Sequence, residues 1–241
     1  MEYIQQELQS ITQFFYLGEL ESFSKAGGLA NENYYVNTGN GKFVIKIIRE
    51  HSASSVRTEL PFFQRLREHN YPASFYLSSP KGECVFESNK LVAVAMHRVE
   101  GSAPIITIDT SLCLGRALAA LHSIPTKGLK TRSAFLNDTY IPQCIDDLAK
   151  AVPQKDLSPY QIEYEKLAEF QSQYKLQKEC IIHGDFSPKN CLFQGEELLS
   201  VIDWEEVSLG YPVLDLALTI FAVCFNESGF DDKLFVALLD G

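Results

Sequence analysis

A polar loop and a second acid further along the chain carry the strongest chemical signal in the sequence. The loop carries Asp185 and ends at Asn190. The next residues predict two short strands, at 191–193 and 198–202, joined by a turn, and Asp203 follows them. In such a hairpin the residue before the first strand lies beside the residue after the second. We therefore expect Asn190 and Asp203 to lie side by side, with Asp185 on the same loop.

Oxygen ligands of this kind suit a hard cation. Mg²⁺ takes few protein oxygens and completes its octahedron with phosphate and water. A carboxylate beside such an ion can also accept the proton of a hydroxyl group. The alternative interpretation is a surface hairpin that carries incidental acids.

A lysine on an apolar strand predicts a second site. Alternation along residues 42–49 gives the strand two faces, Val44, Lys46 and Ile48 on one and Phe43, Ile45 and Ile47 on the other. A buried charge without a partner is costly, so Lys46 either reaches the strand edge or meets an anion. Gly27 and Gly28 lie between predicted strands, where backbone N–H groups can approach a phosphate closely. On its own, such a pair is also typical of a plain hairpin.

Three motifs resemble, in this order, those of the aminoglycoside phosphotransferase-like kinases, which include choline kinases and protein-kinase-fold homoserine kinases. They are His183-Gly184-Asp185 with Asn190, Ile202-Asp203-Trp204, and Asp215-Leu216-Ala217. The N-terminal part is most similar to the homoserine kinases, in the stretches 17–20, 31–38 and 59–63. The resemblance extends over residues 17–225.

The resemblance implies an α+β, two-lobed protein-kinase-like fold. We expect residues 1–99 to form a small N-lobe with an antiparallel, nucleotide-binding sheet and a helix over 54–70 that begins close to Thr58. Residues 100–241 should form a mostly helical C-lobe that carries the catalytic loop and the metal hairpin. Family members usually carry further C-terminal helices that line the acceptor pocket, which leaves open a truncated C-terminus here.

The same resemblance assigns roles around ATP and Mg²⁺. Asp185 would accept the proton of the acceptor hydroxyl, while Asn190 and Asp203 would hold Mg²⁺ against the triphosphate. Lys46, held by a helical Glu59, would contact the phosphates.

Further residues would bind the base and brace the catalytic loop. The glycines Gly27 and Gly28 would contact phosphate, and the adenine would meet the gatekeeper Met96, the carbonyl of His97 and the N–H of Val99. His183 and Asp215 would brace the loop, and His122 would cap the end of a helix. Lys189 either reaches the transferring phosphate or faces solvent.

The composition of the chain argues against some classes of binding partner. The formal net charge of −10 argues against binding to a nucleic-acid backbone. The six cysteines show no metal spacing, which is typical of reduced thiols in a cytoplasmic protein. The start of the chain has no signal-peptide pattern, and the longest apolar run, 216–225, is too short to span a bilayer. Oligomeric state is not encoded in any of these features.

The sequence thus predicts an ATP-dependent phosphotransferase that moves the γ-phosphate to the hydroxyl of a small amine-bearing molecule, such as homoserine, a choline-like amino alcohol or an aminoglycoside. Candidate partners for the ammonium group are Asp146, Asp147, Glu205 and Glu206. A protein kinase is the weaker alternative, because the span from Asp203 to Asp215 is too short for an activation segment. A pseudokinase that binds nucleotide without turnover also stays open.

Overall fold

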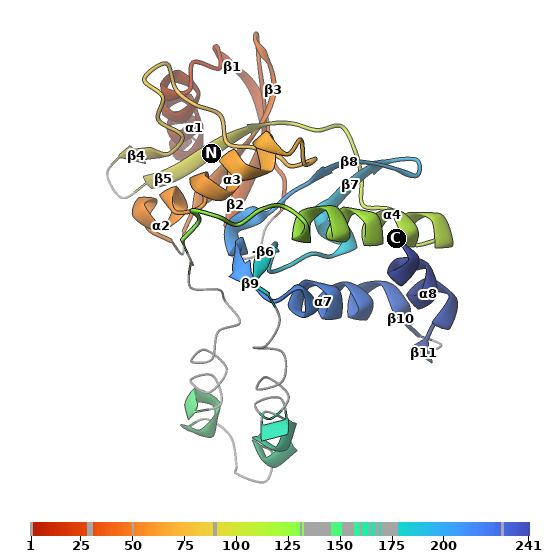
Figure 1. Ribbon diagram of the computed structural model, residues 1–241. Coiled ribbons are helices and arrows are strands. Elements are labelled where there is room, and N and C mark those ends of the chain that lie inside the picture. Colours follow the sequence, from red (N-terminus) through yellow and green to blue (C-terminus); the bar gives the residue numbers. More distant parts are fainter. Residues whose placement is uncertain are drawn as a thin grey trace. The chain divides into compact units, whose positions relative to one another are not determined.

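The chain forms two compact units in the computed structural model (Figure 1). The first comprises Met1–Pro104 and Cys191–Glu205, and the second Ile105–Asn190 and Glu206–Gly241. The structure describes residues 2–27, 31–49, 51–88, 91–130, 132, 146–150, 157–159, 161–163, 165–166, 169, 178–227 and 229–241.

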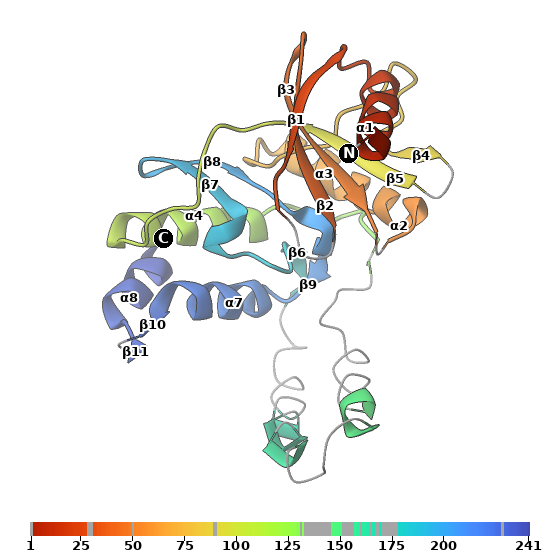
Figure 2. The same cartoon turned by 180° about the vertical axis from the view of Figure 1, so that it is seen from behind.

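A five-stranded antiparallel sheet in the order β1-β2-β3-β5-β4 forms the centre of the first unit (Figures 1 and 2). Its strands are β1 (Leu20–Lys25), β2 (Glu32–Thr38), β3 (Gly41–Ile48), β4 (Phe86–Ser88) and β5 (Leu91–His97). In the register, Lys46 of β3 pairs with Asn33 of β2 and Val94 of β5. Lys46 is therefore on the central strand of the sheet.

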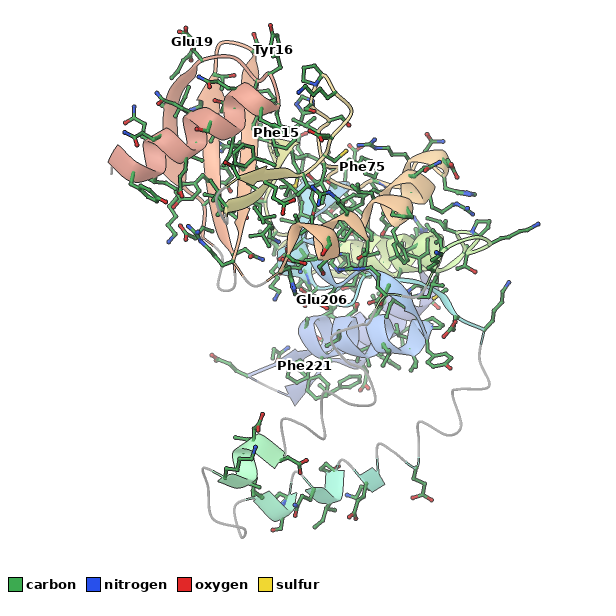
Figure 3. All side chains as sticks on the ribbon, turned by 90° about the vertical axis from the view of Figure 1, so that its left-hand side faces the viewer. Phe15, Tyr16, Glu19, Phe75, Glu206 and Phe221 are labelled. Carbon is green, nitrogen blue, oxygen red and sulfur yellow. The ribbon has the colours of Figure 1, made fainter. Side chains whose placement is uncertain are left out.

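One face of the sheet packs against helix α1 (Glu2–Phe14). The buried residues Leu8 and Ile11 of this helix, together with Phe15 just beyond it, meet Phe43 and Ile45 of β3 (Figure 3 labels Phe15). The i, i+3, i+7 spacing of these apolar residues predicts this helix, and the two-residue alternation of β3 predicts which strand residues it covers. The opposite face, which carries Val44 and Lys46, is left for the site.

The helix predicted over 54–70 is two helices, α2 (Ala53–Arg57) and α3 (Leu60–Glu68). Pro61 lies in the first turn of α3, where the missing N–H costs no helical hydrogen bond. Glu59 is the N-cap residue of α3. The break falls close to the predicted start near Thr58, and it places Glu59 at a helix end.

The hairpin of β7 (Cys191–Gln194) and β8 (Glu197–Val201) belongs to the first unit, although the sequence analysis placed it in the second. The reason is backbone hydrogen bonding that no local pattern reveals. Val201 pairs with the segment at Ala73, and Phe193 exchanges hydrogen bonds with Ser102. A short 3-10 helix, η2 (Trp204–Glu206), follows the hairpin.

Helices α4 (Ile108–His122), α7 (Pro212–Cys224) and α8 (Asp232–Asp240) pack together in the second unit (Figure 1). Two small sheets accompany them: β6 (Cys180–Ile182) with β9 (Ser208–Gly210), and β10 (Phe225–Asn226) with β11 (Gly229–Phe230). A 3-10 helix, η1 (Pro188–Asn190), ends the loop that carries Asp185. Gly115 of α4 lies directly against the backbone carbonyl of Leu238 in α8, so a side chain there would force the helices apart.

Most predicted elements have counterparts within two or three residues of the predicted bounds. The spacing of apolar residues over 160–176 predicts a further amphipathic helix, which lies largely outside the described residues. The sequence also predicts a short helical piece near 145–149, and residues 146–150 are helical. Within the described part of the chain, no helix combines the length and the apolar character needed to cross a membrane.

Candidate active site

A pocket opens on the sheet face opposite α1 and lies wholly within the first unit. Its polar lining includes Lys46, Tyr76 and Asp203, and its apolar lining includes Val44 and Trp204. The predicted base-binding residues Met96, His97 and Val99 also line it. The fold thus brings the predicted phosphate-binding lysine and the predicted adenine-binding segment to one cavity.

Lys46 is 6% exposed, and two carboxylates hold its ammonium group. Nζ lies 2.5 Å from Asp203 Oδ1 and 2.7 Å from Glu205 Oε2. Burial by itself lowers the pKa of Lys46, but the charges and hydrogen bonds of these two acids more than offset it and hold the pKa above its ordinary value. The lysine is therefore a fixed cation in the pocket, as its position on an apolar face predicted.

Asp203 has a left-handed backbone, with φ of 66°. Among non-glycine residues, Asp and Asn tolerate this conformation best. Left-handed non-glycine residues cost free energy and are concentrated at functional sites. At this position the turn brings the carboxylate to Lys46, which supports a functional role for Asp203.

Glu59 does not pair with Lys46 in this structure, which differs from the prediction. All ion pairs and hydrogen bonds that the described residues give the Lys46 amine go to Asp203 and Glu205. Glu59 is 1% exposed and accepts a 2.6 Å hydrogen bond from the hydroxyl of Tyr76. The carboxylates within hydrogen-bond distance of the Lys46 amine are therefore those of Asp203 and Glu205.

The loop that carries the glycines connects to the same cluster through Asn31. Its side-chain Nδ2 donates to Glu205 Oε2 at 2.6 Å, and its Oδ1 accepts from the backbone N–H of Arg49 at 2.8 Å. Gly27 has φ of 81°, a conformation that glycine adopts without strain, whereas Gly28 lies outside the described residues. Ala26 lines the pocket just before this loop.

Asp215 holds the backbone of the loop that carries Asp185, in the second unit. Its buried carboxylate accepts the backbone N–H groups of His183 at 2.8 Å and Gly184 at 2.9 Å. His122 lies in the last turn of α4, but its Nε2 is 3.1 Å from Asp215 Oδ2 rather than serving as the predicted cap, and Ser123 is the C-cap residue. The bracing predicted for Asp215 is formed.

The loop itself gathers three of the predicted site residues. Asn190 Nδ2 donates to both the backbone carbonyl and Oδ2 of Asp185, each at 2.9 Å, and Lys189 Nζ is 3.0 Å from the same Oδ2. The side chains of Lys189 and Asp185 are 70% and 39% exposed. Lys189 is thus largely exposed to solvent, one of the two predicted alternatives, and it forms an ion pair with Asp185. His183 is buried, and its Nδ1 accepts the backbone N–H of Asp185 at 3.2 Å.

The backbone conformation and close packing at position 184 require a glycine. Its φ is 85°, and a Cβ atom would lie 2.6 Å from the Cβ of Glu206 (labelled in Figure 3). Any side chain would push the loop away from Glu206 and disturb Asp185. The structure therefore explains the glycine between His183 and Asp185.

A comparison of the sequence with family models decides the family. The model of the "Phosphotransferase enzyme family" matches residues 25–240, most of the chain. The chain belongs to the phosphotransferase enzyme family.

Curated relatives and solved structures agree with this assignment. The homoserine kinase of Methylobacillus glycogenes is 26% identical over 234 residues, which are 94% of this chain and 71% of that protein. A structure of amicoumacin kinase hAmiN in complex with AMP-PNP, Ca²⁺ and Ami has a TM-score of 0.78 at 14% identity, and the match covers 98% of this chain and 76% of that chain. A microcompartment-associated aminopropanol kinase has a TM-score of 0.73 at 17% identity, with 96% and 80% covered.

The predicted α+β protein-kinase-like fold is confirmed by these fold matches. The predicted class of function, an ATP-dependent small-molecule phosphotransferase, is confirmed at the level of the family. The predicted roles of individual residues are not tested by a family match.

Three residues of this phosphotransferase to which the sequence analysis gave no such place belong to the pocket wall or to the charge cluster around Lys46. Glu205 was considered only as a partner for a substrate amine, yet its carboxylate contacts Lys46 and Asn31. Tyr76 was not singled out at all. The position of Glu205, two residues after the predicted metal ligand, was a usable signal, whereas nothing local marks Tyr76 or Asn31.

Proposed function

We propose that this phosphotransferase moves the γ-phosphate of ATP to the hydroxyl of a small amine-bearing acceptor. The observation that carries the proposal is the Lys46–Asp203 contact inside a pocket bordered by Met96, His97 and Val99. The Lys46 ammonium group would bind the negatively charged triphosphate. The backbone polar groups of the segment 96–99 would bind the adenine base. Phosphoryl transfer needs such positioning and charge neutralisation more than covalent chemistry.

Asp185 is the proposed acceptor of the hydroxyl proton. Its carboxylate is partly exposed, so a substrate can reach it, and Asn190 and Lys189 fix its orientation. His183 and Asp215 hold the loop backbone beneath it. A carboxylate held in this way can orient the attacking hydroxyl and remove its proton as the bond to phosphorus forms.

Asn190 and Asp203 are the proposed ligands of Mg²⁺, and their donor atoms fit a hard cation. Asn190 uses its Nδ2 on Asp185, which leaves its side-chain oxygen without a hydrogen bond to any described residue. The Asp203 carboxylate offers a second oxygen besides the one that contacts Lys46. When bound, the ion would neutralise phosphate charge and orient the triphosphate.

An amine on the acceptor is supported by the names of the relatives and by the charge of the chain. Homoserine and aminopropanol, named in two of them, are both small amino alcohols. The acids proposed for the ammonium group are unequal, because Glu205 is committed to Lys46 and Asn31, and Asp147 forms an exposed ion pair with Lys150. Glu206, which lies against Gly184 in the loop that carries Asp185, is the partner that we propose. The free cysteines among the described residues support a cytoplasmic location.

An ADP-release screen tests the proposal. Purified protein with ATP and Mg²⁺ is offered homoserine, aminopropanol, choline, an aminoglycoside and a neutral sugar, and phosphorylated products are identified by mass spectrometry. We expect turnover with at least one amine-bearing alcohol. Phosphorylation of the sugar alone would contradict the proposal that the acceptor carries an amine. Tight ATP binding without any phosphate transfer would favour a pseudokinase.

The metal ligands need a separate test. Asp203→Asn keeps the size of the side chain but removes the charge that would hold Mg²⁺. We expect the Mg²⁺ concentration for half-maximal activity to rise at least about tenfold, since a charged interaction is worth about 1.5–3 kcal/mol. An unchanged Mg²⁺ dependence in both Asp203→Asn and Asn190→Ala would exclude these ligands.

A further inference from the structure

A tyrosine that no part of the proposed chemistry uses stands at the wall of the nucleotide pocket. Tyr76 is 5% exposed, lines the pocket with Lys46 and Asp203, and lies outside every helix and strand. Its hydroxyl donates to Glu59 Oε2 at 2.6 Å, a distance typical of a strong hydrogen bond between a hydroxyl and a carboxylate. We propose that Tyr76 is a positioning residue for nucleotide binding, which holds the buried Glu59 carboxylate beside the phosphate end of the pocket. This inference rests on the proposed function, because it assigns the pocket to a nucleotide.

Three contacts hold Tyr76 in place. Its backbone forms a bridge with Met96, its carbonyl accepts a 3.0 Å hydrogen bond from Arg67 Nη2, and its ring meets the ring of Phe63 edge-on at 4.7 Å. A side chain on an anchored backbone, with its ring packed, loses little freedom when its hydroxyl makes a hydrogen bond. The hydroxyl is therefore a rigid anchor for whatever it contacts.

The hydroxyl of Tyr76 contacts a buried acid, because Glu59 is 1% exposed. Burial of a carboxylate is costly unless hydrogen bonds compensate it. Burial, followed by the charge and the hydrogen bond of Glu59, raises the pKa of Tyr76 well above its ordinary value, so the tyrosine remains a proton donor at any physiological pH. The pair is thus a permanent O–H to carboxylate contact.

The position of the pair relates it to Lys46. The charges of Glu205 and Asp203, the two acids that hold Lys46, also act on Tyr76. A nucleotide that enters the pocket brings phosphates, which attract Lys46 and repel the acids around it. With its carboxylate held by Tyr76, Glu59 is a negative charge of fixed position toward which Lys46 can turn as the phosphates displace the other two acids.

The chain offers a matched control on strand β2. Tyr34 is 7% exposed, and its hydroxyl donates to Glu32 Oε2 at 2.7 Å. This second tyrosine–glutamate pair has the same chemistry but does not line the pocket. Tyr34→Phe therefore removes an equivalent hydrogen bond without touching the proposed site.

The single tryptophan supplies a direct signal. Trp204 lines the pocket next to Asp203, so its fluorescence reports occupancy without any turnover. Titration of the full chain with ADP and Mg²⁺ should show that Tyr76→Phe raises the dissociation constant about tenfold, because the Glu59 carboxylate loses the hydrogen bond that holds it. With ATP, KM(ATP) should rise by a similar factor while kcat changes less than about twofold. Tyr34→Phe should alter neither value.

A double variant separates positioning from simple destabilisation. If the hydroxyl acts through Glu59, Tyr76→Phe combined with Glu59→Gln should weaken ADP binding no more than Glu59→Gln alone. The inference is overturned if Tyr76→Phe binds ADP like the wild type, or if the two substitutions have additive effects. It is also overturned if Tyr76→Phe only lowers the melting temperature, to the same extent as Tyr34→Phe.

These readouts distinguish failure of the inference from failure of the proposed function. A wild-type protein that binds ADP but phosphorylates no acceptor would contradict the transfer reaction, while the ADP titration would still decide the role of Tyr76. A wild-type protein that does not bind ADP would overturn both.

Discussion

Lys46 Nζ lies 2.5 Å from Asp203 Oδ1, although these two residues are far apart in the sequence. The contact joins the central strand of the sheet to the turn after the β7–β8 hairpin, both within the first unit. It places a buried cation and an acid that can bind a metal on the wall of one pocket. The predictions below depend on this arrangement or on the loop that carries Asp185.

Lys46→Ala should weaken the use of ATP far more than the use of the acceptor. The substitution removes the cation and leaves Asp203 and Glu205 to repel the phosphates. We expect KM(ATP) to rise about tenfold or more, given about 1.5–3 kcal/mol for a charged interaction. Steady-state kinetics with each substrate varied in turn measure this. Lys42→Ala is the control, because Lys42 lies on the same strand but is exposed and pairs with Glu100. A larger rise in the acceptor KM than in KM(ATP) would contradict the assignment.

Asp185→Asn should lower kcat by about 10²–10⁴, the usual contribution of a general base. The amide keeps the shape of the side chain, but it cannot accept the hydroxyl proton. Nucleotide affinity, followed through Trp204 fluorescence, should change little. Asp232→Asn, at an exposed site at the start of α8, controls for the loss of one charge. A near-normal kcat would show that Asp185 is not the catalytic residue.

Asp215→Asn should destabilise the second unit by about 2–3 kcal/mol, because a buried carboxylate that accepts two backbone N–H groups is replaced by an amide that can present only one oxygen. Urea unfolding followed by circular dichroism measures the shift in midpoint. The loss should be smaller in a His122→Ala background, since that background has already lost one partner of Asp215. Asp240→Asn, at an exposed position near the chain end, should have little effect. Equal midpoints for Asp215→Asn and Asp240→Asn would refute the bracing role.

Cys180 should resist alkylation in the folded protein. Burial, with a smaller contribution from the charge of Asp215, raises the pKa of this thiol from 9.0 to about 12. At pH 8 its thiolate fraction is then about a thousandfold below that of an ordinary thiol, and the thiolate is the reactive form. Iodoacetamide followed by peptide mass spectrometry should modify the partly exposed Cys84 and Cys113 first, and Cys180 only after urea is added. Equal labelling of all three in the native state would contradict this.

The raised pKa of Cys180 also makes the stability of the folded protein depend on pH. The folded thiol ionises at a higher pH than the unfolded one, so its contribution to stability is complete below pH 9 and is lost as the pH rises toward 12. Replacement of Cys180 by Ala should reduce the fall in the urea midpoint between pH 8 and pH 10. A steeper fall in the variant would give the opposite sign and reject the assignment.

Local patterns were sufficient for much of the site. The alternation of β3 determines that Lys46 faces away from the α1 core, because successive strand residues point to opposite faces whatever the rest of the fold does. The spacing of Asp185 and Asn190 determines that they meet, because one short loop and a 3-10 turn connect them. Gly184 and Asp215 were also recognisable. The motifs that contain them are short, but their order and spacing along the chain are restrictive.

The partners of the buried charges were decided only by the tertiary structure. Nothing local indicates that Glu59 contacts Tyr76, or that the β7–β8 hairpin belongs to the first unit. A buried charge takes whichever partner the packed chain brings within hydrogen-bond distance, and residues remote in sequence are placed there by the sheet register and by backbone bridges. The sequence therefore determined which groups need partners, and the tertiary structure decided which partners they have.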